Sequence, residues 1–173
     1  MRLLTLLMGV LTATSIYADE SVEAKIARAM SAAPDYVSAE ATIMDTDGTL
    51  LRQGTNGWMC HPGGAPGDDH PMCNDAVWTS LMGAMGAGKE YVGDRIGISY
   101  MLKGDMNVSN SDPTATDPNN GDVWVQEGPH LMIWVPRDML KGLTDDPYAG
   151  GPYVMWSDTP YAHIMVPLGE RTE

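Results

Sequence analysis

The sequence predicts an α+β domain built on a mostly antiparallel sheet, with an N-terminal helix, one or two further helices and one disulfide. Three observations support this class. Helix-forming segments and segments with strand-like alternation are interspersed along the chain. Most strand signals follow a long polar segment in the second half of the chain. The chain shows no long-period repeat and no composition shift that would mark a domain boundary, so we expect one domain over residues 19–173.

The first 18 residues have the features of a secretory signal peptide. They carry one basic residue, Arg2, then an apolar run and a small residue at Ala18. The apolar run is too short for a convincing membrane anchor, and no later segment is long and apolar enough to be one. We therefore expect cleavage after Ala18 and a periplasmic or secreted protein without a transmembrane anchor.

The first half of the mature chain predicts two helices and a hairpin. Residues 21–33 are rich in helix formers, and Pro34 ends them. Two apolar runs flank the Asp47-Gly48 turn, which predicts a β-hairpin. Asn74 or Asp75 can cap a second helix, in which apolar residues follow at helical spacing.

The second half predicts four strands. A strand over residues 95–104 precedes the polar segment 107–122, which we expect to be a loop. A short helix is predicted at 137–143. The remaining strands are expected in three segments: 128–136, 152–156 and 161–167.

Two cysteines, Cys60 and Cys73, enclose a Gly/Pro-rich segment. In an exported chain a pair of this kind most simply forms a disulfide. The alternative is a metal site formed by Cys60, His61, His70 and Cys73, whose ligand types suit zinc. The adjacent positions of Cys60 and His61 make an awkward chelate, and an oxidising compartment favours the disulfide.

The net charge of −13 excludes some classes of partner. An acidic chain repels phosphate backbones and anionic membrane surfaces, so we do not expect nucleic acid binding. The acidic residues are spread along the chain, as on a solvated surface. The chain also has 14 Met and no Phe, so some methionines are expected to fill the core in place of Phe.

Two short segments repeat the pattern His-x-Met: His130 with Met132, and His163 with Met165. Residues two apart on a strand point to the same face, so each strand is expected to separate its His and Met from its aliphatic residues. If the aliphatic side packs on the core, the His and Met side lines a second layer, a groove or a site. Tyr153 and Met155 on the intervening strand could join it.

Imidazole and thioether groups together form a soft ligand set that suits copper, particularly Cu(I). The segment GPHLM resembles the His-x-Met motif of periplasmic copper chaperones with a cupredoxin-like fold, which bind Cu(I) through His and Met. The resemblance covers only these residues and implies a ligand chemistry. In the copper hypothesis that the paired strands suggest, His130, Met132, His163 and Met165 are the ligands, Met155 is a possible fifth ligand, and Trp134 shields the site from water and oxidants.

A second resemblance covers most of the mature chain. The segments TNGWMC, PMCNDAVW, GPHLM, GGPYVMW and TPYAHIMVP resemble a group of exported bacterial proteins. This resemblance implies export and brings no functional site with it.

Three functions follow as expectations. The first is non-catalytic binding of copper by the His and Met side chains. The second is a small hydrolase or small-molecule binder, with His130 or His163 as the acid–base residue beside an unidentified acid. The third is an envelope interaction module that uses exposed Trp58, Trp124 and the polar loop. Ordinary packing of a Phe-free core also explains the repeated His-x-Met pattern.

Overall fold

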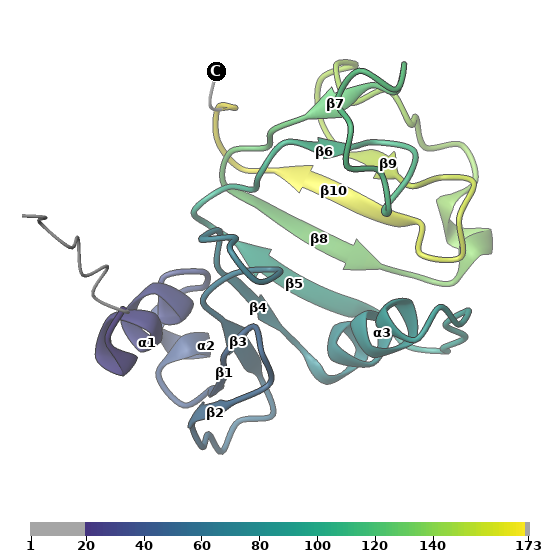
Figure 1. Cartoon of the computed structure of the whole chain (residues 1–173). Helices are drawn as coiled ribbons and strands as arrows, with labels where there is room; N and C mark the ends of the chain where they lie inside the picture. Colours follow the sequence, from purple (N-terminus) through teal and green to yellow (C-terminus); the bar gives the residue numbers. More distant parts are fainter. Residues whose placement is uncertain (1–19, 172–173) are drawn as a thin grey trace, which may run out of the picture.

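The structure is a computed structural model that describes residues 20–171, so the predicted signal peptide lies outside the described residues (Figure 1). The helices are α1 (Val22–Met30), α2 (Asp35–Ser38), α3 (Ala76–Gly86) and the 3-10 helix η1 (Arg137–Leu140). The strands are β1 (Thr42–Met44), β2 (Leu50–Arg52), β3 (Met59–His61), β4 (Met72–Asn74), β5 (Gly97–Met101), β6 (Val108–Ser109), β7 (Trp124–Val125), β8 (His130–Trp134), β9 (Tyr153–Met155) and β10 (His163–Pro167).

The main sheet has the strand order β2-β1-β3-β4-β5-β8-β10-β9, and β6 and β7 form a separate two-stranded ribbon. Among the described pairs only β1 and β3 run parallel, whereas the others are antiparallel. Helices α1 and α2 lie at the β1–β3 end of the sheet, and the β6–β7 ribbon lies near β9 and β10 (Figure 1). The α+β class, the mostly antiparallel sheet and the presence of helices are therefore confirmed.

Local sequence explains where α1 and α3 begin. The Ser21 side chain accepts a hydrogen bond from the Ala24 N–H at the start of α1. Asp75 caps α3 by accepting from the Trp78 N–H, and its second oxygen accepts from the Ile98 N–H of β5. One carboxylate therefore starts the helix and fixes it to the sheet.

The two sides of the sheet differ in burial on β8 and β10, and both pack against other residues: the His and Met side in one core cluster and Ile133 and Ile164 in another. On β8 and β10 the His, Met and Trp side chains are buried, whereas the aliphatic side chains between them are half-buried. We call the buried side the His/Met face. It packs on Trp78 and Leu81 of α3 and on Val108 of β6 in one core cluster. The His and Met side chains of these two strands thus lie in the core.

Other local predictions are confirmed or refined. The Asp47-Gly48 turn joins β1 to β2, and Gly48 has a φ of +86°, a conformation that favours glycine. The predicted short helix at 137–143 is a single 3-10 turn, η1. The polar segment predicted as a loop contains β6, because Val108 and Ser109 pair with β7.

Cys60 and Cys73 face each other on β3 and β4 and form a disulfide, as predicted. The bonded sulfurs carry no thiolate charge, so the zinc site that used both cysteines does not form in this state. Their side chains lie in a second core cluster on the α1 side of the sheet, opposite to the His/Met face. Within residues 20–171, no helix is both long and apolar enough to cross a bilayer.

Candidate functional site

The strand register brings the two His-x-Met pairs together on the His/Met face. Met132 on β8 lies directly opposite Met165 on β10, and His163 lies opposite Met155 on β9. His130 lies opposite Pro167, four residues from His163 along β10. Four residues of extended strand span about 13 Å, so the two imidazoles flank the central methionine pair from opposite ends.

Each imidazole is held in the same way. The Nδ1–H of His130 donates to the Gly128 carbonyl at 2.7 Å, and that of His163 donates to the Tyr161 carbonyl at 3.0 Å. A carbonyl oxygen can only accept, so Nδ1 carries the proton of each neutral ring and Nε2 carries the lone pair. Both Nε2 atoms are buried without a hydrogen-bond partner in the part of the chain that the structure describes. Two lone pairs are therefore directed into a methionine-rich core.

Aromatic rings surround His163. Trp78 and Trp156 contact its ring edge-on, with centroid distances of 5.1 and 5.0 Å. Trp156 has a φ of +55°, a left-handed conformation that costs a non-glycine residue energy. Its indole N–H donates to the Ser109 carbonyl, which joins the β6 ribbon to the site. Trp134, expected to shield the site, is buried against Tyr91.

Burial keeps both imidazoles neutral. It lowers the pKa of His163 from 6.5 to about 4, although the hydrogen bond to the Tyr161 carbonyl opposes the shift. Burial also lowers the pKa of His130, although the Gly128 carbonyl and Glu127 oppose the shift.

We expect this burial to destabilise the protein in acid. Unfolded His163 takes up its proton near pH 6.5 and folded His163 near pH 4, so the neutral ring favours folding fully above 6.5. As pH falls from 6.5 to about 4, His163 alone should lower the unfolding free energy by roughly 3 kcal/mol relative to a variant without this imidazole. Urea unfolding at a series of pH values measures this loss. His163→Leu should flatten the profile, and an equally steep profile in that variant would assign the loss to other groups.

A buried ion pair lies near His130, and sequence patterns did not reveal it. Oε1 of Glu127 accepts hydrogen bonds from the Tyr153 hydroxyl at 2.9 Å and from Arg171 Nη2 at 2.7 Å. Glu127 is 2% exposed, and its Oε2 is buried without a partner among the described residues. No hydrogen bond joins Glu127 to His130 within residues 20–171, and the His130 Nδ1–H donates to the Gly128 carbonyl.

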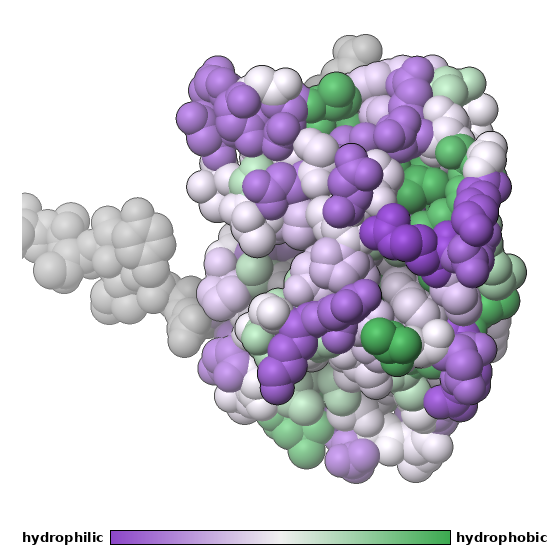
Figure 2. Space-filling model, turned by 90° about the vertical axis from the view of Figure 1, so that its right-hand side faces the viewer, coloured by the Kyte–Doolittle hydropathy of each residue, from purple (hydrophilic) through white to green (hydrophobic). Residues whose placement is uncertain are grey.

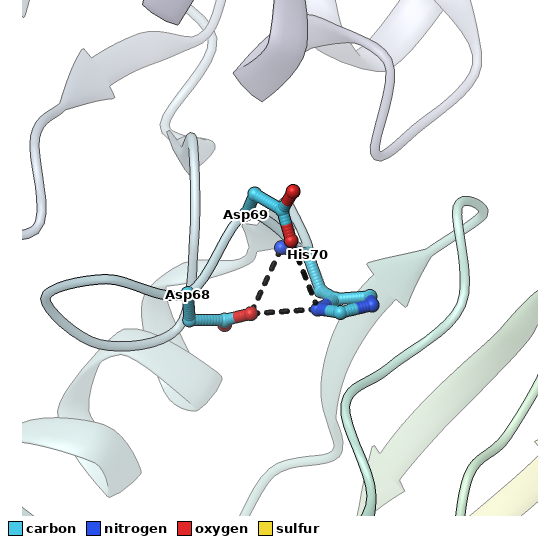
Figure 3. A group of neighbouring side chains, drawn as sticks. All are labelled: Asp68, Asp69 and His70. Carbon is cyan, nitrogen blue, oxygen red and sulfur yellow. Dashed lines mark hydrogen bonds and ion pairs between the residues drawn. The ribbon is translucent and has the colours of Figure 1, made fainter. Parts of the chain in front are cut away.

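A third group of polar residues lies in the connection between β3 and β4 (Figure 3). His70 Nδ1 lies 2.7 Å from Asp68 Oδ1 and 3.5 Å from Asp69 Oδ1. The Asp68 carboxylate also accepts from the Gly64 and His70 backbone N–H groups. These bonds shape the loop, and Asp69 is 80% exposed. The group has metal-ligand types, but its geometry is explained by the loop alone.

The surface residues expected for an interaction module are less available than predicted. Trp58 and Trp124 are half-buried, and Trp58 contacts the ring of Tyr100. On the side of the molecule that carries η1, hydrophobic areas are separate and bordered by hydrophilic residues (Figure 2). This side therefore presents no single broad apolar patch.

Comparison with known proteins adds no relative. No family model, curated protein or solved structure matches the chain. The candidate function therefore depends on the geometry of the His/Met face.

Proposed function

We propose that the protein is an exported, non-catalytic binder of Cu(I), with His130, Met132, His163 and Met165 as ligands. Met155, opposite His163, is available as a fifth donor. The observation that carries the proposal is the pair of buried, unpartnered Nε2 atoms beside facing thioethers. A buried nitrogen lone pair without a donor is costly, and a coordinated metal ion would satisfy such a lone pair.

The donor set favours a soft, monovalent ion. Two neutral imidazoles and two or three thioethers bring no negative charge, and thioethers select Cu(I) over harder divalent ions. Zinc sites usually contain thiolate or carboxylate ligands as well, and the only cysteines in the chain are joined in a disulfide. The hydrogen bonds from Nδ1 to backbone carbonyls would orient each ring as in known metal–histidine sites.

Export is part of the same proposal. The predicted signal peptide at residues 1–18 and the Cys60–Cys73 disulfide both favour an oxidising compartment. Thioether ligands remain available in such a compartment, whereas free thiols are oxidised. A copper-binding protein built on Met and His therefore suits the periplasm or the extracellular space.

A competitive Cu(I) titration of the mature protein tests the proposal. We expect the His/Met face to bind one Cu(I) ion, and His130→Ala or His163→Ala should each weaken binding at this face at least about 100-fold. Even loss of a residue that merely supports a metal ligand costs about 10–100-fold. Met165→Leu removes a thioether while nearly keeping the side-chain volume, so it should weaken binding without unfolding the core.

His70→Ala is the matched control, since His70 bonds to Asp68 on a loop outside the site. The His70→Ala variant should bind Cu(I) with the same affinity as the wild type. If His130→Ala and His163→Ala also bind Cu(I) like the wild type, the two His-x-Met pairs only pack the core.

A further inference from the structure

A cavity of about 210 Å³ lies beside the β1–β3–β4 part of the sheet and contains its own set of soft donors. His61 and three methionines, Met44, Met72 and Met82, line it. They come from four different elements, namely β3, β1, β4 and α3. None of these residues belongs to the ligand set proposed above.

The sheet register explains why three of these donors meet. His61 lies directly opposite Met72 across the β3–β4 pair. Ile43 lies beside Cys60 in the parallel β1–β3 pair, so the next residues, Met44 and His61, are also neighbours. Neighbouring strands are about 4.8 Å apart, which places a Met–His–Met row within reach of one ion. Met82 contributes from α3 above the row.

His61 is prepared to act as a ligand in this cavity. Its ring hydrogen-bonds to the backbone of Met44, which orients the imidazole beside the cavity that it lines. His61, Met44 and Met82 are half-buried, whereas His130 and His163 are 0% exposed. An ion from solvent can therefore reach this cavity more directly than it can reach the His130–His163 site.

The same row of side chains continues toward the buried site. Cys73 lies opposite Tyr100, so the preceding residue of β4, Met72, and the following residue of β5, Met101, are neighbours. Met101 in turn lies directly opposite His130. Met72 and Met101 also share one core cluster. Five successive strand positions across the sheet are therefore occupied by soft donors: Met44, His61, Met72, Met101 and His130.

We infer that this cavity is a second soft-cation site, with ligands His61, Met44, Met72 and Met82, through which an ion enters the His130–His163 site. One imidazole and up to three thioethers suit Cu(I) or Ag(I). Transfer along the row needs only the exchange of one neutral donor for the next. The entry role rests on the proposed function, whereas the existence of the second site does not.

Native mass spectrometry with Ag(I), a redox-stable soft cation, tests the second site in the mature protein. We expect two bound ions in the wild type and one in His61→Ala. The double variant His130→Ala/His163→Ala should also bind one, at the cavity. Met82→Leu keeps the volume of the helix residue and should weaken the cavity site about tenfold, which covers the case in which His61→Ala misfolds. Met139→Leu, at a methionine 59% exposed, is the matched control.

The outcomes separate the two proposals. In one outcome the wild type binds one ion, and the ion is lost in the His130→Ala/His163→Ala variant but kept in His61→Ala. This outcome overturns the cavity site and does not contradict the proposed function. The opposite result is a wild type that binds one ion, with the ion lost in His61→Ala and kept in the His130→Ala/His163→Ala variant. This result supports the cavity site and overturns the proposed function. Absence of any bound Ag(I) overturns both.

The entry role has its own readout. Trp78 contacts His163, so its fluorescence should report filling of the buried site in a rapid-mixing experiment. His61→Ala should slow this filling at least about tenfold while leaving the final occupancy of the buried site unchanged. An unchanged rate would overturn the entry role.

Discussion

Replacing Arg171 with Ala should destabilise the protein by about 3–5 kcal/mol, because it leaves the buried carboxylate of Glu127 without its cation. Arg171 Nε and Nη2 lie 3.0 and 2.7 Å from Glu127 Oε1, and Nη2 also donates to the Pro147 carbonyl. The guanidinium lies 4.6 Å from the ring centroid of Tyr148. Urea unfolding at neutral pH measures the loss.

Two further variants separate the charge effect from lost packing. Lys141→Ala removes a surface ion pair between Lys141 and Asp138, whose side chains are 78% and 87% exposed respectively. This variant should lose less than about 1 kcal/mol of unfolding free energy. Adding Glu127→Gln to Arg171→Ala removes the unpaired charge and should restore part of the stability. A loss below about 1 kcal/mol in Arg171→Ala would contradict the assignment of Glu127 as a buried, paired carboxylate.

Trp78→Ala should cost about 3–5 kcal/mol, since it removes one of the largest fully packed side chains of the His/Met-face core. Trp78 is 2% exposed, belongs to the same core cluster as Met132 and Met165, and contacts the ring of His163. The indole therefore joins α3 to the candidate site. Urea unfolding of the wild type and the variant measures the change in the free energy of unfolding.

Trp78→Phe is the matched variant for this position. The Trp78 indole N–H is buried without a hydrogen-bond partner among residues 20–171, so Phe loses area without losing a hydrogen bond. Its cost should be well below that of Trp78→Ala. If the two variants lose equal stability, the assignment of the indole N–H as a group without a hydrogen-bond partner is wrong.

The faces of β8 and β10 could be predicted because strand alternation is a local property. His130, Met132 and Trp134 share one side, and His163 and Met165 share the corresponding side, as their burial pattern requires. The disulfide, the Asp47-Gly48 hairpin and the two capped helices also follow from neighbouring residues. In each case the signal lies within about fifteen residues of chain.

The more buried side of the sheet could not be predicted, because burial depends on what covers each face. Hydrophobicity favours Leu131 and Ile133 for the core, but α3 and β6 cover the opposite face and bury His130 and Met132 there. The sequence does not contain the direction from which these elements approach.

Contacts between distant segments were missed for a similar reason. Glu127 and Arg171 are 44 positions apart, and no local pattern distinguishes either from a surface residue. The row from His61 to His130 depends on the strand order β3-β4-β5-β8, which is a property of the sheet topology. The sequence predicts individual strands with His or Met at alternate positions, but it does not predict the register between these strands.

The proposed copper-binding site is tested most directly by observing its two Nε2 atoms. Long-range ¹H–¹⁵N correlation spectra of the imidazole rings, recorded without metal and with saturating Ag(I), observe these atoms individually. We expect His130 and His163 to be Nδ1–H tautomers without metal, and both Nε2 resonances to shift and couple to silver with it. Two Nε2 resonances that Ag(I) leaves unchanged would contradict metal binding at the His/Met face.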